Sequence, residues 1–212
     1  MSDNPDASAD PPSREALQAE LERERARARE IDHRAKNSLQ LAGSLALLTA
    51  RRTDTPETQA TLKALHQRIA AIAAVHRGFL DGPRPGRFDL TAFLAEHLPS
   101  LARSGPREAS LDLDLEPVEI AASAAAPLAL IIGELVGNAL QHGGPTPQVS
   151  VSLAREGDGF RLAVADRGPG LADPQAAEAF GLMIVRLMAL QLRASLVFED
   201  AQPGLRALVT LP

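Results

Sequence analysis

The residues from Glu30 to Asn37 could carry phosphoryl-transfer chemistry. They lie in a long helical pattern, and helical neighbours three and four positions apart share a face, so Glu30, His33 and Asn37 lie together. Arg34 and Lys36 add positive charge beside that face. An imidazole with an acid before it, an amide after it and cations nearby suits a phosphate group. The alternative is a charged helix face that is only solvated, which is the commoner situation.

Glu134 and Asn138 form a second candidate site. They stand four positions apart in a helical pattern, so their side chains face the same way. A carboxylate and an amide oxygen suit a hydrated Mg²⁺, which prefers oxygen ligands and keeps several waters. His142 ends this segment and could approach a phosphate. The alternative is a pair of exposed polar residues on an otherwise apolar helix.

A third group follows a strand pattern. Asp166 ends that strand, and Gly168 and Gly170 let the backbone pass close to a ligand. The carboxylate could accept a hydrogen bond from an exocyclic amine such as that of adenine, although an ordinary turn would have the same residues. Gly181 lies in the first turn of a later helical pattern, and the free amides at a helix N-terminus bind phosphates.

Two helical patterns must position the first group. The first runs from Ser13 to Arg52, and Thr55 and Pro56 then restart a helix that continues to Asp81. Residues 13–81 are therefore predicted to form a helical hairpin. Because two helices bury only part of each apolar stripe, we expect a homodimer with a four-helix bundle. Residues 1–12 are predicted to be disordered and residues 82–86 to be a linker.

The periodicity changes after the linker, and residues 87–212 read as an α+β module. Alternating residues at 110–115 are typical of a half-buried strand. We expect helices covering one face of a mixed sheet. The predicted helices are 90–102, 124–142 and 180–192, and the predicted strands are 110–115, 118–121, 148–154, 160–165, 195–199 and 206–211.

The composition excludes several classes of protein. The chain of 212 residues has a net charge of −5, which argues against nucleic-acid binding. It has no Cys, which excludes disulfides and thiolate catalysis. Residues 1–12 lack the apolar core of a signal peptide, and the apolar run 120–133 is shorter than the roughly 20 residues that span a bilayer. We expect a cytoplasmic protein without direct membrane insertion.

The order of these motifs resembles that of a sensor histidine kinase. The phosphoacceptor stretch reads H-R-x-K-N at His33, which is similar to the branch close to the HWE kinases. The resemblance covers roughly residues 25–212. It implies a dimerisation and phosphotransfer hairpin (Glu30–Gln40, with Arg68-Ile69 and Val75-His76) and then a GHKL (Bergerat-type) α/β sandwich. That ATP-binding domain is shared with gyrase, Hsp90 and MutL.

The resemblance also implies ATP and Mg²⁺ as ligands and a role for each candidate residue. His33 would accept the phosphoryl group, Glu30 or Asp32 would set its tautomer, and Asn37 could orient water for dephosphorylation. The remaining residues would bind the nucleotide: Glu134 and Asn138 with Mg²⁺ and phosphates, Asp166 with adenine, and Gly168, Gly170 and Gly181 as the glycine boxes. The phosphoryl group would then pass to an aspartate of a response-regulator receiver domain.

Two alternatives stay open. The Gly-Thr that usually supports the adenine pocket reads Gly204-Leu205, Arg193-Ala194 replaces a usual glycine region, and the segment between Gly170 and Gly181 is short. All three departures bear on ATP affinity and turnover. The changed Gly204-Leu205 and the lack of a sensor domain favour a non-catalytic phosphotransfer adaptor with a degenerate ATP domain. The kinase is favoured by the intact Glu134, Asn138, Asp166, Gly168 and Gly170. An anti-sigma serine kinase would have no need of the His33 hairpin.

Overall fold

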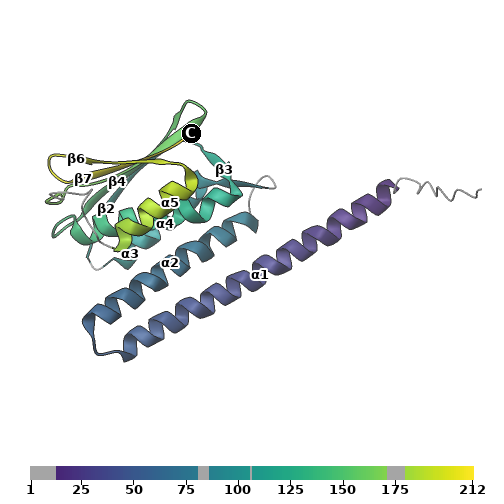
Figure 1. Cartoon of the computed structure of the whole chain (residues 1–212), viewed down its shortest axis with the longest axis horizontal. Helices are drawn as coiled ribbons and strands as arrows, with labels where there is room; N and C mark the ends of the chain where they lie inside the picture. Colours follow the sequence, from purple (N-terminus) through teal and green to yellow (C-terminus); the bar gives the residue numbers. More distant parts are fainter. Residues whose placement is uncertain (1–12, 81–85, 106, 171–179) are drawn as a thin grey trace, which may run out of the picture.

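The computed structural model describes residues 13–80, 86–105, 107–170 and 180–212. The predicted disordered N-terminus, most of the predicted linker and the segment between Gly170 and Phe180 lie outside the described residues. The described chain forms a helical hairpin followed by an α/β domain (Figure 1).

The hairpin consists of α1 (Arg14–Arg52) and α2 (Pro56–Leu80), as the sequence predicted. Pro56 begins α2, where its missing N–H costs no helical hydrogen bond. The helices are antiparallel, and α1 extends well beyond the end of α2 (Figure 1). His66 links them, because its Nδ1 lies 2.9 Å from the carbonyl oxygen of Gly43. A side chain at Gly43 would crowd that imidazole, with its Cβ 3.2 Å from Nδ1.

The α/β domain contains one five-stranded mixed sheet with the strand order β2-β4-β5-β7-β6. Only β2 and β4 are parallel, and every other pair is antiparallel. A small antiparallel pair, β1 with β3, lies beside it. The strands are β1 (Arg87–Asp89), β2 (Ser110–Leu115), β3 (Glu119–Ala121), β4 (Gln148–Glu156), β5 (Gly159–Asp166), β6 (Ser195–Asp200) and β7 (Leu205–Leu211).

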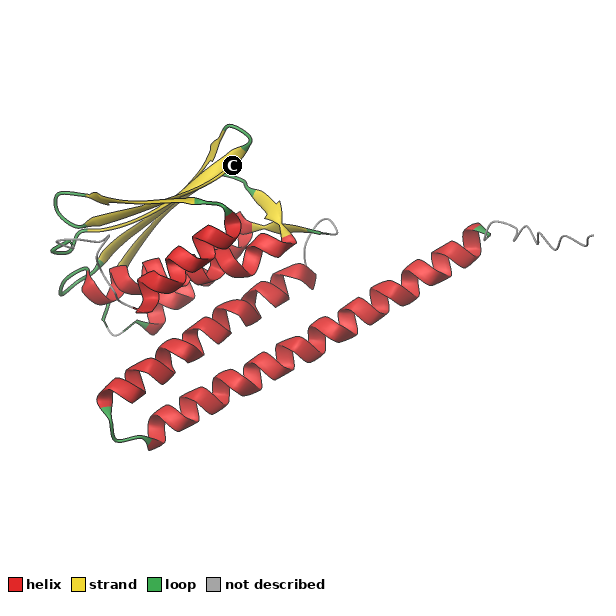
Figure 2. Ribbon diagram, in the orientation of Figure 1, coloured by secondary structure: helices red, strands yellow, loops and turns green. Residues whose placement is uncertain are grey.

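Three helices, α3 (Leu90–Ser104), α4 (Ala122–His142) and α5 (Phe180–Leu192), cover one face of the sheet (Figure 2). Asp89 caps α3 by accepting a hydrogen bond from the backbone N–H of Ala92 at 2.8 Å. The central helix, α4, has fully buried side chains at Leu128, Ile131 and Ile132. Among the described helices, α4 alone is long and apolar enough to cross a bilayer, but it forms the core of this domain instead.

Helix α2 also packs against the α/β domain. Ala71, Ala74 and Val75 belong to the same buried cluster as the residues of α4. Helix α2 therefore lies between α1 and the α/β domain (Figure 1). The apolar spacing in α2 predicted its packing on α1 but not this second interface, which is made mainly by small alanine side chains.

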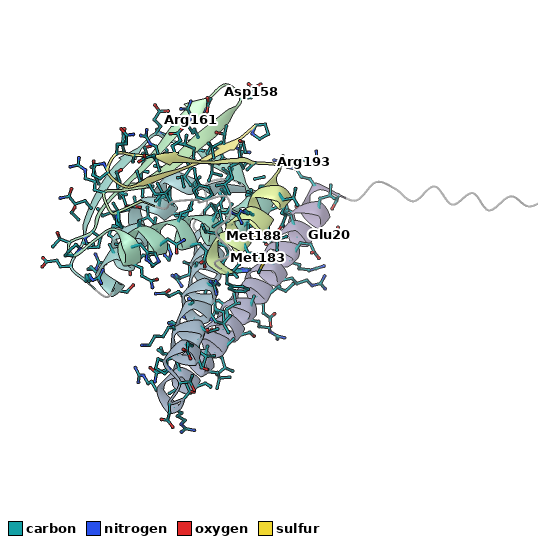
Figure 3. The ribbon with its side chains drawn as sticks, turned by 60° about the vertical axis from the view of Figure 1, so that its left-hand side comes forward. Glu20, Asp158, Arg161, Met183, Met188 and Arg193 are labelled. Carbon is teal, nitrogen blue, oxygen red and sulfur yellow. The ribbon has the colours of Figure 1, made fainter. Side chains whose placement is uncertain are left out.

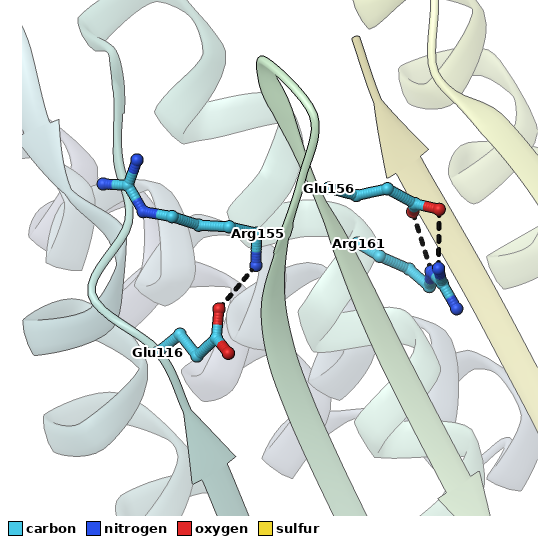
Figure 4. A network of polar contacts seen from close by, with 4 residues as sticks. All are labelled: Glu116, Arg155, Glu156 and Arg161. Atoms are coloured by element: carbon cyan, nitrogen blue, oxygen red, sulfur yellow. Dashed lines mark hydrogen bonds and ion pairs between the residues drawn. The ribbon is translucent and has the colours of Figure 1, made fainter.

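Ion pairs hold the exposed turn at the far end of the sheet. Glu156 and Arg161 form a bidentate pair at 2.6 and 2.8 Å across the β4–β5 hairpin. Glu116 accepts a hydrogen bond from the backbone N–H of Arg155 at 2.7 Å (Figure 4). These contacts lie at the end of the β4–β5 hairpin opposite to Asp166, the last residue of β5.

The predicted helices and strands of the α/β domain are all present, with ends within a few residues of the prediction. Strand β1 was not predicted, because three residues are too few to display a period. The fold class is confirmed: a helical region followed by a sheet domain with helices on one face.

Candidate functional site

His33 lies on an exposed face of α1, one helical turn from Asn37. The side-chain nitrogen of Asn37 is 3.4 Å from Nδ1 of His33. The carboxylate of Glu30 accepts a hydrogen bond from Arg34 at 2.5 Å, so its neighbour in this structure is the guanidinium and not the imidazole. This geometry differs from the expectation that Glu30 sets the tautomer. The imidazole is open to an approaching phosphate.

Asp166 is the meeting point of three chain segments. Its Oδ1 accepts a hydrogen bond from the backbone N–H of Gly168 at 2.7 Å. A Cβ on Gly168 would lie 2.6 Å from the carbonyl oxygen of His142, at the end of α4. A Cβ on Gly204 would overlap the carbonyl oxygen of Asp166, and Gly204 also has a φ of +108°. Glycine at these two positions lets α4, β5 and the start of β7 converge.

A cavity of about 120 Å³ opens beside the carboxylate of Asp166, and we call it the Asp166 cavity. Its walls come from α4, α5 and strands β5 to β7. They are mostly apolar, and an acid among apolar walls suits a flat heteroaromatic base that carries an amine. The lining residues are Leu135, Asn138, Ala139, His142, Val164, Asp166, Gly170, Leu182, Phe198, Leu205 and Ala207.

Asp166 also touches a wider hollow of about 770 Å³ on the open face of the sheet. That hollow is broad and lined by exposed polar side chains. The Asp166 cavity, with its apolar walls, is the better candidate for a base.

Glu134 and Asn138 face the start of α5, as their spacing predicted. A Cβ on Gly181 would lie 2.5 Å from Oε2 of Glu134 and 4.0 Å from Oδ1 of Asn138. A side chain at position 181 would therefore displace the carboxylate. Asn138 also lines the Asp166 cavity, so the amide connects the two candidate groups.

Arg68 of α2 also belongs to this site, although no chemical role was predicted for it from the sequence. Its Nε donates to Oε1 of Glu134 at 2.7 Å, and its Nη2 donates to Oε2 at 3.1 Å. Its guanidinium carbon lies 5.0 Å from the ring centroid of Phe180, within the range of a cation–π contact. A lone arginine on a helical pattern carries no signal in the sequence, since its partner stands 66 positions away.

A second cavity, of about 420 Å³, lies between α2 and α4, and we call it the α2–α4 cavity. It is lined by Arg68, Glu134 and Gly181, and it shares Asn138 and His142 with the Asp166 cavity. His142, which the sequence offered as a phosphate neighbour, therefore stands where the two cavities meet.

These residues fit ATP. The Asp166 cavity offers an acid for an adenine amine, and Gly168 provides a turn that a side chain would fill. The fit to Mg²⁺ is partial. Within the described ranges, no group of three or more His, Cys, Asp or Glu side chains could hold a metal ion. Asn138 and Glu134 would have to share the ion with phosphates and water.

The structure thus brings together every predicted binding residue of the α/β domain, but it keeps His33 apart from them. Helix α2 lies between α1 and the α/β domain that contains the Asp166 cavity (Figure 1). An exposed histidine on a paired helix and a mostly apolar cavity with an acid and an amide in its wall are the features expected of a protein that transfers phosphoryl groups from a nucleotide.

Comparisons with known proteins identify the family. The family model described as "Histidine kinase" matches residues 30–104 of the sequence. The model described as "Histidine kinase-, DNA gyrase B-, and HSP90-like ATPase" matches residues 124–212. The chain belongs to the histidine kinase family, with an HWE-like phosphotransfer region and a GHKL ATPase domain.

Similar proteins agree with this family. The chain is 31% identical over 184 residues to the sensor histidine kinase PdtaS of Mycobacterium tuberculosis, covering 82% of this chain and 36% of that protein. PdtaS of Mycolicibacterium smegmatis is 31% identical over 190 residues, covering 83% and 37%. The chain therefore spans little more than a third of the length of these relatives.

Solved structures share the fold. The histidine kinase domain of the blue-light activated histidine kinase EL346 from Erythrobacter litoralis has a TM-score of 0.65 and 19% identity. The alignment covers 83% of this chain and 95% of that one. The mycobacterial sensor histidine kinase MprB has a TM-score of 0.50 and 20% identity, with coverage of 59% and 97%.

Proposed function

We propose that the protein autophosphorylates on His33 with ATP and passes the phosphoryl group to an aspartate of a response-regulator receiver domain. The observation that carries the proposal is that one chain combines an open imidazole on the hairpin with an Asp166 cavity whose acid, amide and glycines are all in place. A non-catalytic adaptor would not need that cavity. Within the part of the chain that the structure describes, no observation favours the adaptor.

The chemistry of the transfer follows from the His33 surroundings. Asn37 occupies the Nδ1 side of the imidazole. With the amide turned so that its oxygen accepts from Nδ1–H, Nε2 is the nitrogen that attacks. The Nε2–P bond forms as the bond between the γ-phosphorus and the β,γ-bridging oxygen breaks, ADP leaves, and the imidazolium loses its Nδ1 proton. Bound Mg²⁺ would supply charge neutralisation on the phosphate oxygens. Positioning and electrostatics supply nearly all the catalysis in such reactions.

Each remaining residue has a role in binding. Asp166 would accept a hydrogen bond from the adenine amine, while Gly168 and Gly170 shape the turn beside it. Asn138 and Glu134 would hold Mg²⁺ and phosphates, and Gly181 would let the start of α5 approach them. Asn37 would orient water when phospho-His33 is hydrolysed.

The assembly is proposed as a cytoplasmic homodimer, in which two hairpins form a four-helix bundle. Exposed leucines at Leu41, Leu45 and Leu48 of α1 support this assembly, because nothing else in the described chain covers them. Within one chain, α2 lies between α1 and the α/β domain, so transfer from a chain's own Asp166 cavity to its His33 would require a rearrangement.

Incubation with γ-labelled ATP and Mg²⁺ tests the proposal. Acid-labile, base-stable label should appear on the wild-type chain, vanish in His33→Ala and persist in the matched control His76→Ala on the facing helix. Transfer to a purified receiver domain should follow. Label that persists in His33→Ala would contradict the site, and no Mg²⁺-dependent binding of an ATP analogue would favour the adaptor.

A further inference from the structure

The contact between Arg68 and Glu134 links the hairpin to the phosphate end of the proposed ATP site. The guanidinium donates to both carboxylate oxygens, at 2.7 and 3.1 Å. The two side chains are only 15% and 14% exposed, so water screens the pair weakly. Bidentate guanidinium–carboxylate pairs are among the stronger polar contacts in proteins. The Arg68–Glu134 ion pair therefore stabilises the packing of the hairpin against the α/β domain.

Arg68 reaches a third element as well. Phe180 begins α5, and its ring lies under the guanidinium. The next residue is Gly181, and a Cβ at that position would lie 2.5 Å from Oε2 of the carboxylate that Arg68 binds. One side chain of α2 thus contacts the Glu134 helix and the start of α5 together.

Mg²⁺ and Arg68 would compete for one carboxylate. Glu134 is the acid that, with Asn138, faces the space proposed for the ion, and both of its oxygens are already engaged by a cation. A guanidinium at that distance neutralises the carboxylate and repels a divalent ion. When Mg²⁺ binds the Glu134 carboxylate, the Arg68–Glu134 ion pair is weakened. The guanidinium then remains mostly buried without a full partner, which is energetically unfavourable for a charged group.

We propose that the Arg68–Glu134 pair is a latch that holds α2 on the α/β domain in the nucleotide-free protein, and that binding of a Mg²⁺–nucleotide opens it. The inference deepens the proposed function, on which it rests, by adding a regulatory step to the same site. With the latch closed, α2 stands between His33 and the Asp166 cavity. With the latch open, the hairpin can reposition. Because coupling between sites is reciprocal, a latch that the nucleotide opens must also weaken nucleotide binding.

A different role for Arg68 predicts the opposite sign. The α2–α4 cavity begins beside Arg68 and meets the Asp166 cavity at Asn138 and His142. A guanidinium there could instead hold the nucleotide phosphates directly. In that case, removing it would weaken binding, whereas removing a latch strengthens binding.

The distance between the hairpin and the α/β domain can be measured directly, because the chain has no Cys and two introduced cysteines would be its only labels. Lys63 on α2 is exposed, and Asp158 lies at the tip of the β4–β5 turn (Figure 3). We would attach spin labels to Lys63→Cys and Asp158→Cys in the full chain and mix it with an excess of unlabelled chain, so that the measured distance lies within one protomer. A single narrow distance is expected without nucleotide, and a longer or broader distribution with Mg²⁺–ADP.

The variant Arg68→Gln should show the broad distribution even without nucleotide. It should also bind Mg²⁺–ADP about fivefold or more tightly, the lower end of typical coupling between sites. Arg51→Gln, at an exposed arginine of α1, is the matched control and should change neither measurement. Arg68→Lys keeps the charge without the bidentate geometry, so it should lie between wild type and Arg68→Gln and guards against a variant that fails to fold.

An unchanged nucleotide-free distance in Arg68→Gln, or weaker Mg²⁺–ADP binding by that variant, would overturn the latch. The distance measurement needs no phosphoryl transfer, so its failure is distinct from failure of the proposed function. If the distance changes with nucleotide but His33 is never labelled, the kinase proposal alone is contradicted. If His33 is labelled but the distance does not change, the latch alone is contradicted.

Discussion

The side-chain nitrogen of Asn37 and the Nδ1 atom of His33 lie 3.4 Å apart, across one turn of α1. Which end of the amide faces the ring decides which imidazole nitrogen carries the proton. If the amide oxygen accepts from Nδ1–H, the Nε2 lone pair is free to attack phosphorus. If the amide nitrogen donates to Nδ1, the proton is on Nε2 and the ring is not a nucleophile at that atom. Asn37 is therefore placed to select the reactive tautomer.

Replacing Asn37 by Ala should lower the rate of His33 phosphorylation by about fivefold, the equivalent of one hydrogen bond of about 1 kcal/mol. Asn37→Asp should keep most of the rate, because a carboxylate accepts from Nδ1–H. Initial rates with saturating ATP measure both variants. Equal rates for wild type and Asn37→Ala would show that the amide does not set the tautomer.

Asp166→Asn should weaken ATP-analogue binding by about tenfold or more, since a hydrogen bond to a charged group contributes about 1.5–3 kcal/mol. The amide oxygen can still accept from Gly168, so the turn should fold, but the amide nitrogen would then face the adenine amine. Calorimetry measures the dissociation constant. Asp158→Asn, in the exposed β4–β5 turn, is the control and should bind as wild type does; unchanged binding by Asp166→Asn would exclude it as the adenine acid.

Sequence periodicity predicted most of this architecture. Long amphipathic and alternating patterns predicted α1, α2 and the sheet strands, and fixed helical spacing predicted that Glu134 and Asn138 face one way. The Arg68–Glu134 pair could not be predicted, because it joins residues 66 positions apart through an interface of small side chains. The convergence at Asp166 requires glycine at position 204, because a Cβ there would overlap the carbonyl oxygen of Asp166. That contact is between segments distant in the sequence, so the residues next to Gly204 do not predict it.

Leu205→Thr should tighten nucleotide binding by about fivefold, because a hydroxyl beside Asp166 adds one hydrogen bond to an otherwise apolar wall. The same change removes apolar surface from the cavity wall, so thermal unfolding should begin at a lower temperature. Leu205→Val has nearly the shape of Thr without the hydroxyl and is the matched control. Tighter binding in both variants would mean that cavity size, and not the hydroxyl, is responsible.

His97 should make the folded protein sensitive to acid. Burial, and then the charge of Arg77, hold the pKa of His97 below its ordinary value, while Glu96 opposes them. The folded state therefore takes up the proton less readily than the unfolded chain. As the pH falls below the ordinary value, the unfolded chain is protonated first, and stability that is present at higher pH is lost until the lowered pKa is passed.

The variant His97→Phe should consequently lose less stability than wild type between about pH 8 and about pH 5.5. Phe preserves the stacking on Phe93, whose ring centroid lies 5.0 Å from that of His97. Denaturant unfolding at each pH measures the difference. Arg77→Gln removes the second cause and should give an intermediate loss, and a loss in His97→Phe as large as in wild type would exclude His97 as the source.

The exposed leucines of the hairpin predict how it assembles. Leu41, Leu45 and Leu48 are 63%, 55% and 53% exposed and follow helical spacing on α1, and Leu65 of α2 is 42% exposed. A fully buried leucine contributes about 1.5–3 kcal/mol, so Leu45→Glu with Leu48→Glu, removing four leucines from a dimer, should raise its dissociation constant more than about a thousandfold. Sedimentation equilibrium measures this constant. Leu190→Glu, at a still more exposed leucine of α5, should leave the dimer intact, and a wild-type monomer at all concentrations would contradict the four-helix bundle.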